Sequence, residues 1–298
     1  MSSSFKIRQI RIAYLFLLPA IIVFTLGLVV PLINTFELSF NRLSMGSRWS
    51  DRDYVGLDNY ERMIEDDHVR SSVGVTLRFA AIVLVAELVI GMGLALLLEK
   101  PIKGAAVFRT IFILPLMVSP VAVGLIWRYL LDGRIGLINH YLGQIGIPAQ
   151  TWLGDPNLAF FSIVITDIWQ WTPFIFIILL AGLQALPAEV LEASRIDGAN
   201  WWQMTFLIKV PMLRSILLVT VLMRLIDVFR ALEVIFIMTF GGPGRSTQVM
   251  SLHIYKTAFT SQTLGYASTI AVVLMFIMLV LSLFLLLFSN PLKERADF

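Results

Sequence analysis

Residues 186–199 read LPAEVLEASRIDGA and lie between two long apolar runs of the chain. Pro187 suits the first position of a helix, because its missing N–H leaves no hydrogen bond unmade there. Glu189 follows in the first turn, where a negative charge favours the helix dipole. Gly198 can adopt a positive φ and end the helix. The pattern predicts a short surface helix followed by a tight turn.

A second helix start follows this turn. Asn200 and Gln203 have the spacing of a capping box, in which each side chain binds the backbone N–H of the other residue. The segment 187–211 is therefore expected to form two short helices that are too polar to span a membrane. Such a surface helix can dock into the groove of a partner protein. It can equally lie at the membrane interface and pack under the rest of the chain.

The composition places this segment in a membrane protein. The 298 residues are 58% hydrophobic and 14% charged, whereas soluble domains average about 45–50% apolar and about 25% charged. The mean hydropathy is +0.83. A soluble fold of this size cannot bury so much apolar surface, but a bilayer accepts it at about 20 apolar residues per spanning helix. A soluble enzyme is excluded.

Six apolar runs predict an all-α, polytopic membrane protein with six transmembrane helices. The expected spans are 12–33, 73–98, 107–131, 158–186, 212–240 and 264–288. The predicted organisation is a cytoplasmic N-terminus at 1–11, a transmembrane domain at 12–288 that carries the cytoplasmic loop 187–211, and a cytoplasmic tail at 289–298.

The charges of the loops set the expected orientation. Residues 1–11 carry three basic and no acidic residues, and loop 99–106 is basic as well. Loop 34–72 carries five basic and eight acidic residues. Short basic loops belong in the cytoplasm, so both termini are predicted to lie inside. Basic cytoplasmic loops, rather than binding of nucleic acid, then explain the net charge of +3.

The chain offers little for metal or cofactor chemistry. It has no cysteine and only three histidines, which are scattered along the sequence. Thiolate metal sites and disulfides are therefore excluded, and no HExxH pair is present. We expect no metal site and no cofactor in this chain.

The polar loop also matches a known family motif. Glu192-Ala193-Ser194, then Gly198, Ile208 and Pro211, resemble the EAA loop of binding-protein-dependent ABC importer permeases, which is written EAA, three residues, G, nine residues, I-x-L-P. Ser194 and Val210 depart from that pattern. The stretches TFGGPG at 239–244 and GLDNY at 56–60 are similar to the carbohydrate-uptake branch of the family, and the chain resembles its maltose-type first permease.

The resemblance implies a function and a set of partners. It implies the type I ABC importer permease fold in the inner membrane of a bacterial or archaeal cell. Such a permease moves a carbohydrate or polyol by alternating access and works with a second homologous permease, two ATP-binding subunits and an external solute-binding protein, surrounded by membrane lipid. The coupling helix that contacts the ATP-binding subunit would include Glu192, Ala193, Ser194, Asp197, Gly198 and Ala199.

The chain itself is expected to be a transport subunit and not an enzyme. It lacks the GxxxxGK[ST] sequence that cradles the phosphates of a nucleotide. ATP and Mg²⁺ would then be bound by the partner subunits. An ion-coupled secondary transporter of a small polar solute is the alternative, because charged residues within its spans could serve ion coupling.

Two of the predicted spans carry polar residues that could line a substrate pathway. The fourth span holds Asp167, Trp169, Gln170 and Trp171, and aromatic rings with a few fixed polar groups are what sugar pockets use. The two tryptophans could instead belong to an interfacial belt.

The fifth span holds Arg224, Asp227, Arg230 and Glu233, which share one helix face. They could pair along that helix as a structural ladder, or Asp227 and Arg230 could bind the hydroxyl groups of a sugar. An unpaired Arg224 or Arg230 in the pathway would favour an anionic substrate.

Overall fold

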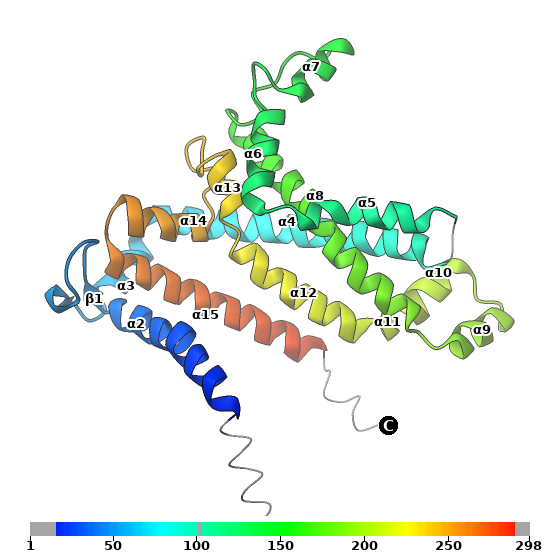
Figure 1. Ribbon diagram of the computed structural model, residues 1–298, viewed down its shortest axis with the longest axis horizontal. Coiled ribbons are helices and arrows are strands. Elements are labelled where there is room, and N and C mark those ends of the chain that lie inside the picture. Colours follow the sequence, from blue (N-terminus) through cyan, green and yellow to red (C-terminus); the bar gives the residue numbers. More distant parts are fainter. Residues whose placement is uncertain (1–15, 101–102, 290–298) are drawn as a thin grey trace, which may run out of the picture. The chain divides into compact units, whose positions relative to one another are not determined.

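The structure, a computed structural model, describes residues 16–100 and 103–289. The expected cytoplasmic N-terminus at 1–11 and most of the tail at 289–298 lie outside the described residues. The described part is mostly helical, and its two strands form one small hairpin (Figure 1). By the clustering of its contacts it consists of two units, residues 16–66 with 254–275, and residues 67–100 and 103–253 with 276–289.

The first unit contains a long helix and a compact polar cap. The helix runs from Phe16 to Leu38 and includes the π-helical segment η1 (Thr25–Val29) and α2 (Val30–Leu38). The remaining elements of this unit are β1 (Asn41–Arg42), the 3-10 turn η2 (Trp49–Asp51), β2 (Asp53–Tyr54), α3 (Asp58–Glu65), the π-helical segment η4 (Lys256–Thr260) and the first part of α15 (Leu264–Ser289).

The cap is held by side chains that satisfy backbone carbonyl groups. β1 and β2 pair antiparallel, with Asn41 opposite Tyr54. The buried Asn59 donates from Nδ2 to the carbonyl oxygens of Ser39 and Asn41, and Thr269 of α15 also donates to Ser39. Because unpaired buried carbonyl groups are costly, these bonds order the loop between the first two long helices.

The second unit contains the remaining helices. They are α4 (Asp67–Leu98), α5 (Ala105–Met117), α6 (Pro120–Leu130), α7 (Leu137–Gln144), α8 (Pro156–Gln184), α9 (Ala188–Ile196), α10 (Trp201–Gln203), the π-helical segment η3 (Met204–Lys209), α11 (Val210–Met212), α12 (Arg214–Phe229), α13 (Glu233–Met238) and α14 (Met250–Tyr255), followed by the end of α15. Figure 1 shows α9 and α10 at the end of α4 and α8 that lies away from α13.

The core of this unit lies between α4, α8 and α12. Ala95, Ile175, Phe176, Leu179 and Leu213 are buried together there. α4 and α8 approach closely at Gly91, where an added Cβ would lie 2.8 Å from Ile175. A glycine at this position lets the two backbones pack side by side, as small residues do in membrane helix pairs.

The described residues contain two kinds of candidate span, single helices and bent pairs of helices. Four helices are long and apolar enough to cross a membrane, namely Phe16–Leu38, Asp67–Leu98, Pro156–Gln184 and Leu264–Leu287. Two further spans are bent pairs, Ala105–Met117 with Pro120–Leu130 at 98° and Trp201–Met212 with Arg214–Met238 at 68°. Each bent pair counted as one span gives six.

The third and fifth expected spans, which the sequence gives as the single ranges 107–131 and 212–240, are each bent. In the third span, the chain leaves the helix at Val118 and Ser119, next to Pro120. The residue before a proline is pushed out of the helical region, so the break falls there. In the fifth span, helical backbone already begins at Trp201, and the chain is irregular between Arg230 and Leu232.

Candidate functional site

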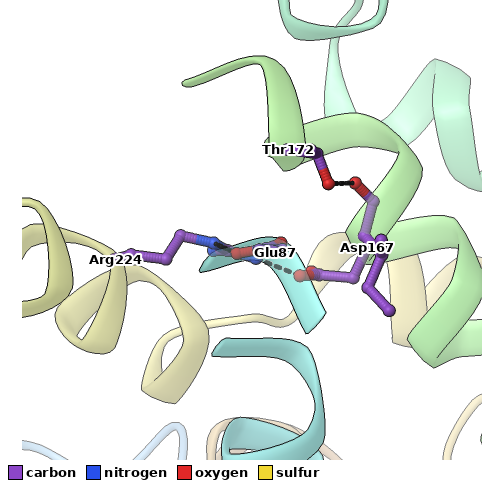
Figure 2. A network of polar contacts seen from close by, with 5 residues as sticks. Glu87, Asp167, Thr172 and Arg224 are labelled. Atoms are coloured by element: carbon purple, nitrogen blue, oxygen red, sulfur yellow. Dashed lines mark hydrogen bonds and ion pairs between the residues drawn. The ribbon is translucent and has the colours of Figure 1, made fainter. Parts of the chain in front are cut away.

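An ion cluster joins the three central helices of the second unit. Arg224 of α12 donates from Nε to Oε2 of Glu87 on α4 at 2.7 Å, and from Nη2 to Oε1 of Glu87 at 2.9 Å. The same Nη2 pairs with Asp167 of α8. The side chains are 1%, 0% and 7% exposed, respectively. Figure 2 shows Arg224 directed at both carboxylates.

The cluster suits its surroundings because every charge has a partner. A charge inside a membrane span is costly unless it is paired, and the planar guanidinium can bind one carboxylate in a bidentate way while reaching a second. Arg224 also lies over the ring of Trp171, 5.0 Å from its centroid. The cluster therefore ties α4, α8 and α12 together at one depth.

A cavity of about 210 Å³ adjoins this cluster. Its lining includes the indole of Trp171 and the charged side chains of Asp167, Arg224, Asp227, Arg230 and Glu233. The irregular backbone at Ala231 and Leu232 also lines it. Non-helical backbone at membrane depth is tolerated where it borders a cavity. Hydrogen-bonding groups of both kinds beside an indole ring suit a solute that carries hydroxyl groups.

The cavity gathers four of the six residues expected to line a substrate pathway, namely Asp167, Trp171, Asp227 and Arg230. The other two point elsewhere. Trp169 packs edge-on against Trp127 at 5.7 Å between ring centroids. Gln170 is buried and donates from Nε2 to the carbonyl oxygen of Val118 at 3.2 Å. Consecutive residues on a helix face different directions, so the four polar and aromatic residues expected on the fourth span cannot all line one cavity.

The expected ladder along the fifth span does not form. Arg224 pairs with α4 and α8, and within the described part of the chain no ion pair joins Asp227, Arg230 or Glu233 to one another. The two carboxylates that pair with Arg224 belong to Glu87 and Asp167 on other helices, and neither is part of the ladder predicted along the fifth span. Because Arg224 is paired, it offers no reason to expect an anionic substrate.

Glu87 is the residue of this site to which the sequence analysis gave no role. The signal that could have found it is its charge within the second apolar run. The second and fourth expected spans carry the carboxylates Glu87 and Asp167, and the fifth carries arginines. Charges in apolar spans commonly pair across the bundle. Sequence alone gave no way to choose among Arg78, Arg224 and Arg230 as its partner.

The loop 187–211 forms the helix and turn that its sequence predicts. α9 covers Ala188–Ile196, and Pro187 is its N-cap instead of its first residue. Gly198 has φ +83°. The N–H groups of Gly198 and Ala199 donate to the carbonyl oxygens of Arg195 and Ser194, at 3.1 and 3.0 Å. These two bonds are those of a Schellman turn.

The capping box that follows is also present. Asn200 and Gln203 each accept the other's backbone N–H at 2.9 Å. Glu192, Ala193, Asp197 and Gly198 are exposed on α9 and its turn, whereas Ser194 is buried and donates to the carbonyl oxygen of Val190. The exposed surface carries the carboxylates of Glu189, Glu192 and Asp197 and apolar side chains such as Ile196, which is 87% exposed. Such a surface can contact a partner protein.

Within the ranges 16–100 and 103–289, no group of three or more His, Asp or Glu residues could hold a metal ion.

The sequence and the fold are similar to those of transport proteins. The family described as "Binding-protein-dependent transport system inner membrane component" matches residues 73–293. The trehalose/maltose transport system permease protein MalF of Thermococcus litoralis is 34% identical, over 100% of this chain and 99% of its own. The sulfoquinovosyl glycerol transport system permease protein SmoG of Agrobacterium fabrum is 31% identical, over 88% and 85%.

The fold is similar to that of a solved permease chain. A crystal structure of a bacterial ABC transporter involved in the import of the acidic polysaccharide alginate contains a chain that aligns with a TM-score of 0.84. The alignment has 23% identity and covers 96% of this chain and 97% of that chain. At this identity the likeness concerns the fold alone.

Proposed function

Because the chain belongs to the family of binding-protein-dependent transport system inner membrane components, we propose that it is one of two permease subunits of an ATP-driven carbohydrate or polyol importer. The chain is a multi-pass inner-membrane transport subunit and not an enzyme. Family membership favours this function over an ion-coupled secondary transporter, which needs no coupling loop.

The geometry of loop 187–211 is the observation that carries the proposal. α9 is short and largely exposed, and it is closed by a Schellman turn at Gly198 and a capping box at Asn200. Because both ends of the loop are attached to long helices and its helix-end backbone groups are hydrogen-bonded, the loop has a fixed shape and is not a flexible linker. The ATP-binding subunits close when they bind ATP. To move the permease as they close, they need a fixed, exposed helix to hold.

The complete importer then has four kinds of component, of which this chain is one. A second homologous permease completes the pathway, two ATP-binding subunits bind ATP and Mg²⁺ beneath the loop, and an external binding protein delivers the solute. Both termini and loop 187–211 lie in the cytoplasm, because the short loops with excess Lys and Arg stay inside. Surrounding lipid covers the exposed apolar helix faces.

The class of substrate is inferred from two observations. The two named relatives transport trehalose/maltose and sulfoquinovosyl glycerol according to their names. The cavity beside the ion cluster presents Trp171, Asp227 and Arg230 to a solute. An indole ring takes the apolar face of a sugar ring, while the carboxylate and the guanidinium bind its hydroxyl groups. Asp227 and Arg230 are therefore our substrate-contacting residues.

The first experiment is co-purification in mild detergent from the native membrane. We expect a second six-span permease and a Walker-motif ATPase to be identified by mass spectrometry. A chain that purifies alone and transports without ATP after reconstitution would refute the proposal.

Two substitutions in the loop test the coupling role. Glu192→Lys and Gly198→Pro should abolish uptake while the chain still inserts in the membrane, because the first reverses a charge on the exposed face and the second cannot adopt the positive φ. Matched controls are Glu61→Lys on α3, also exposed, and Gly146→Ala, at another glycine of positive φ (+81°). Normal uptake in both loop variants would remove the loop from the mechanism.

A further inference from the structure

A second ion pair lies far from the cavity, where the coupling loop ends. Lys209 of η3 donates from Nζ to Oε1 and Oε2 of Glu99 at 2.5 and 2.6 Å. The two residues are 110 positions apart in the chain. Their side chains are 4% and 15% exposed. The bond is therefore shielded from solvent, unlike an exposed ion pair, which holds two side chains only loosely.

Glu99 directly follows α4, and this end of α4 is fixed from two sides. The carbonyl group of Leu98, the last residue of α4, accepts a hydrogen bond from Nη2 of Arg109 on α5 at 2.7 Å. The final carbonyl groups of a helix have no partner within it, and positive groups stabilise that end. Arg109 and Lys209 together hold the end of α4 against α5 and η3.

The coupling loop is consequently attached at both of its ends to one helical body. At its start, only Ala185–Pro187 separate α8 from α9. At its end, the helical stretch Trp201–Met212 carries Lys209, which binds the end of α4. α4 and α8 are themselves packed tightly at Gly91. A displacement of α9 therefore reaches this pair of helices from both ends of the loop.

The direct route from the loop to the cavity is bent. The stretch Trp201–Met212 meets Arg214–Met238 at 68°, so a push along the first is not directed along the second. The Lys209–Glu99 pair gives a second route, into α4. Glu87 of the ion cluster lies on α4, about 18 Å from Glu99 at 1.5 Å per residue. Glu87 in turn holds Arg224 and reaches the cavity.

We propose that Lys209 and Glu99 are positioning residues that transmit the displacement of the coupling helix α9 into α4, and through Glu87 to the substrate cavity. This inference rests on the proposed function, because it needs an ATP-driven movement of α9. Without the pair, a displacement of α9 reaches the α4–α8 body only through the connection Ala185–Pro187, and the end of α4 follows it less closely. ATP hydrolysis then continues, but fewer cycles move a solute.

The test uses the complete transporter with its binding protein in proteoliposomes, and it measures solute molecules moved per ATP hydrolysed. Lys209→Met keeps much of the side-chain length and removes the charge. Glu99→Gln keeps the shape and serves as the second variant if the first accumulates poorly. Each should lower the transport ratio about fivefold or more, while binding-protein-stimulated ATP hydrolysis stays within about twofold.

The reversed pair Glu99→Lys/Lys209→Glu provides the rescue. It should restore a large part of the lost ratio, because the ion pair can form again with its charges exchanged. ATP hydrolysis that stays intact while the ratio falls separates this role from a purely structural one. Lys103→Met is the matched control, because Lys103 is exposed and lies in loop 99–106 near Glu99. It should leave the ratio unchanged. An unchanged ratio in both single variants, or equal losses of hydrolysis and transport, would overturn the inference. If no ATP-binding subunit assembles with the unsubstituted chain, the proposed function itself fails.

Discussion

Removing Arg224 should destabilise the protein more than removing any exposed arginine. In Arg224→Met, three charge-assisted contacts are lost, and two carboxylates remain in the core without a cation. Glu87 and Asp167 are 0% and 7% exposed, so water cannot compensate for the loss. Breaking a buried ion pair by removing one partner costs about 3–5 kcal/mol.

That free energy predicts a measurable shift in melting temperature. About 2–4 °C per kcal/mol gives a decrease of roughly 5–20 °C in Tm. Thermal aggregation of the detergent-purified protein, followed by size-exclusion chromatography, measures this shift. Arg230→Met is the matched control, because Arg230 is exposed and no ion pair within the described ranges includes it. Its Tm should stay within a few degrees of the unsubstituted protein, about 1 kcal/mol or less.

A neutral version of the cluster separates charge from packing. The triple variant Glu87→Gln/Asp167→Asn/Arg224→Met contains no buried charge, so it should recover much of the lost stability. Were Arg224→Met to melt within about 2 °C of the unsubstituted protein, the cluster would not hold the three helices together. A triple variant as unstable as the single one would show that the cost comes from packing and not from the unpaired carboxylates.

Three further changes have defined outcomes. Gly198→Ala should destabilise the turn by about 1–2 kcal/mol, because an L-residue is strained at φ +83°, and amide exchange at Ala199 should then accelerate. Asn139→Ala removes the carbonyl oxygen that binds Trp152 Nε1 and the N–H of Gln150, so the fluorescence of Trp152 should shift as its loop opens. The N–H groups of Ile135 and Arg134 bind the Asp132 carboxylate and lower its pKa. The charged carboxylate therefore stabilises the folded turn above the usual pKa of about 3.9, and this stabilisation is lost as pH falls through the lowered pKa. Asp132→Asn should accelerate amide exchange at Arg134 and Ile135 at neutral pH. The unsubstituted turn should open only in strong acid.

The sequence by itself determined the features that depend on composition and on neighbours in the chain. A hydrophobic content of 58% places the chain in a bilayer. Its long apolar runs favour helices there, because a helix satisfies its backbone groups within one segment. The turn at Gly198 and the capping box at Asn200 were also predictable. Their hydrogen bonds join residues no more than five positions apart, so the local pattern contains all that forms them.

Tertiary structure decided which groups meet across the bundle. Arg224 pairs with Asp167 and Glu87, which lie 57 and 137 positions away, and the sequence offered closer charges such as Asp227. Helix packing also turns Trp171 to the cavity and Trp169 to Trp127. Helical periodicity fixes the relative directions of neighbouring side chains. Which direction faces the core depends on where the other helices pack, and on where the third and fifth spans bend.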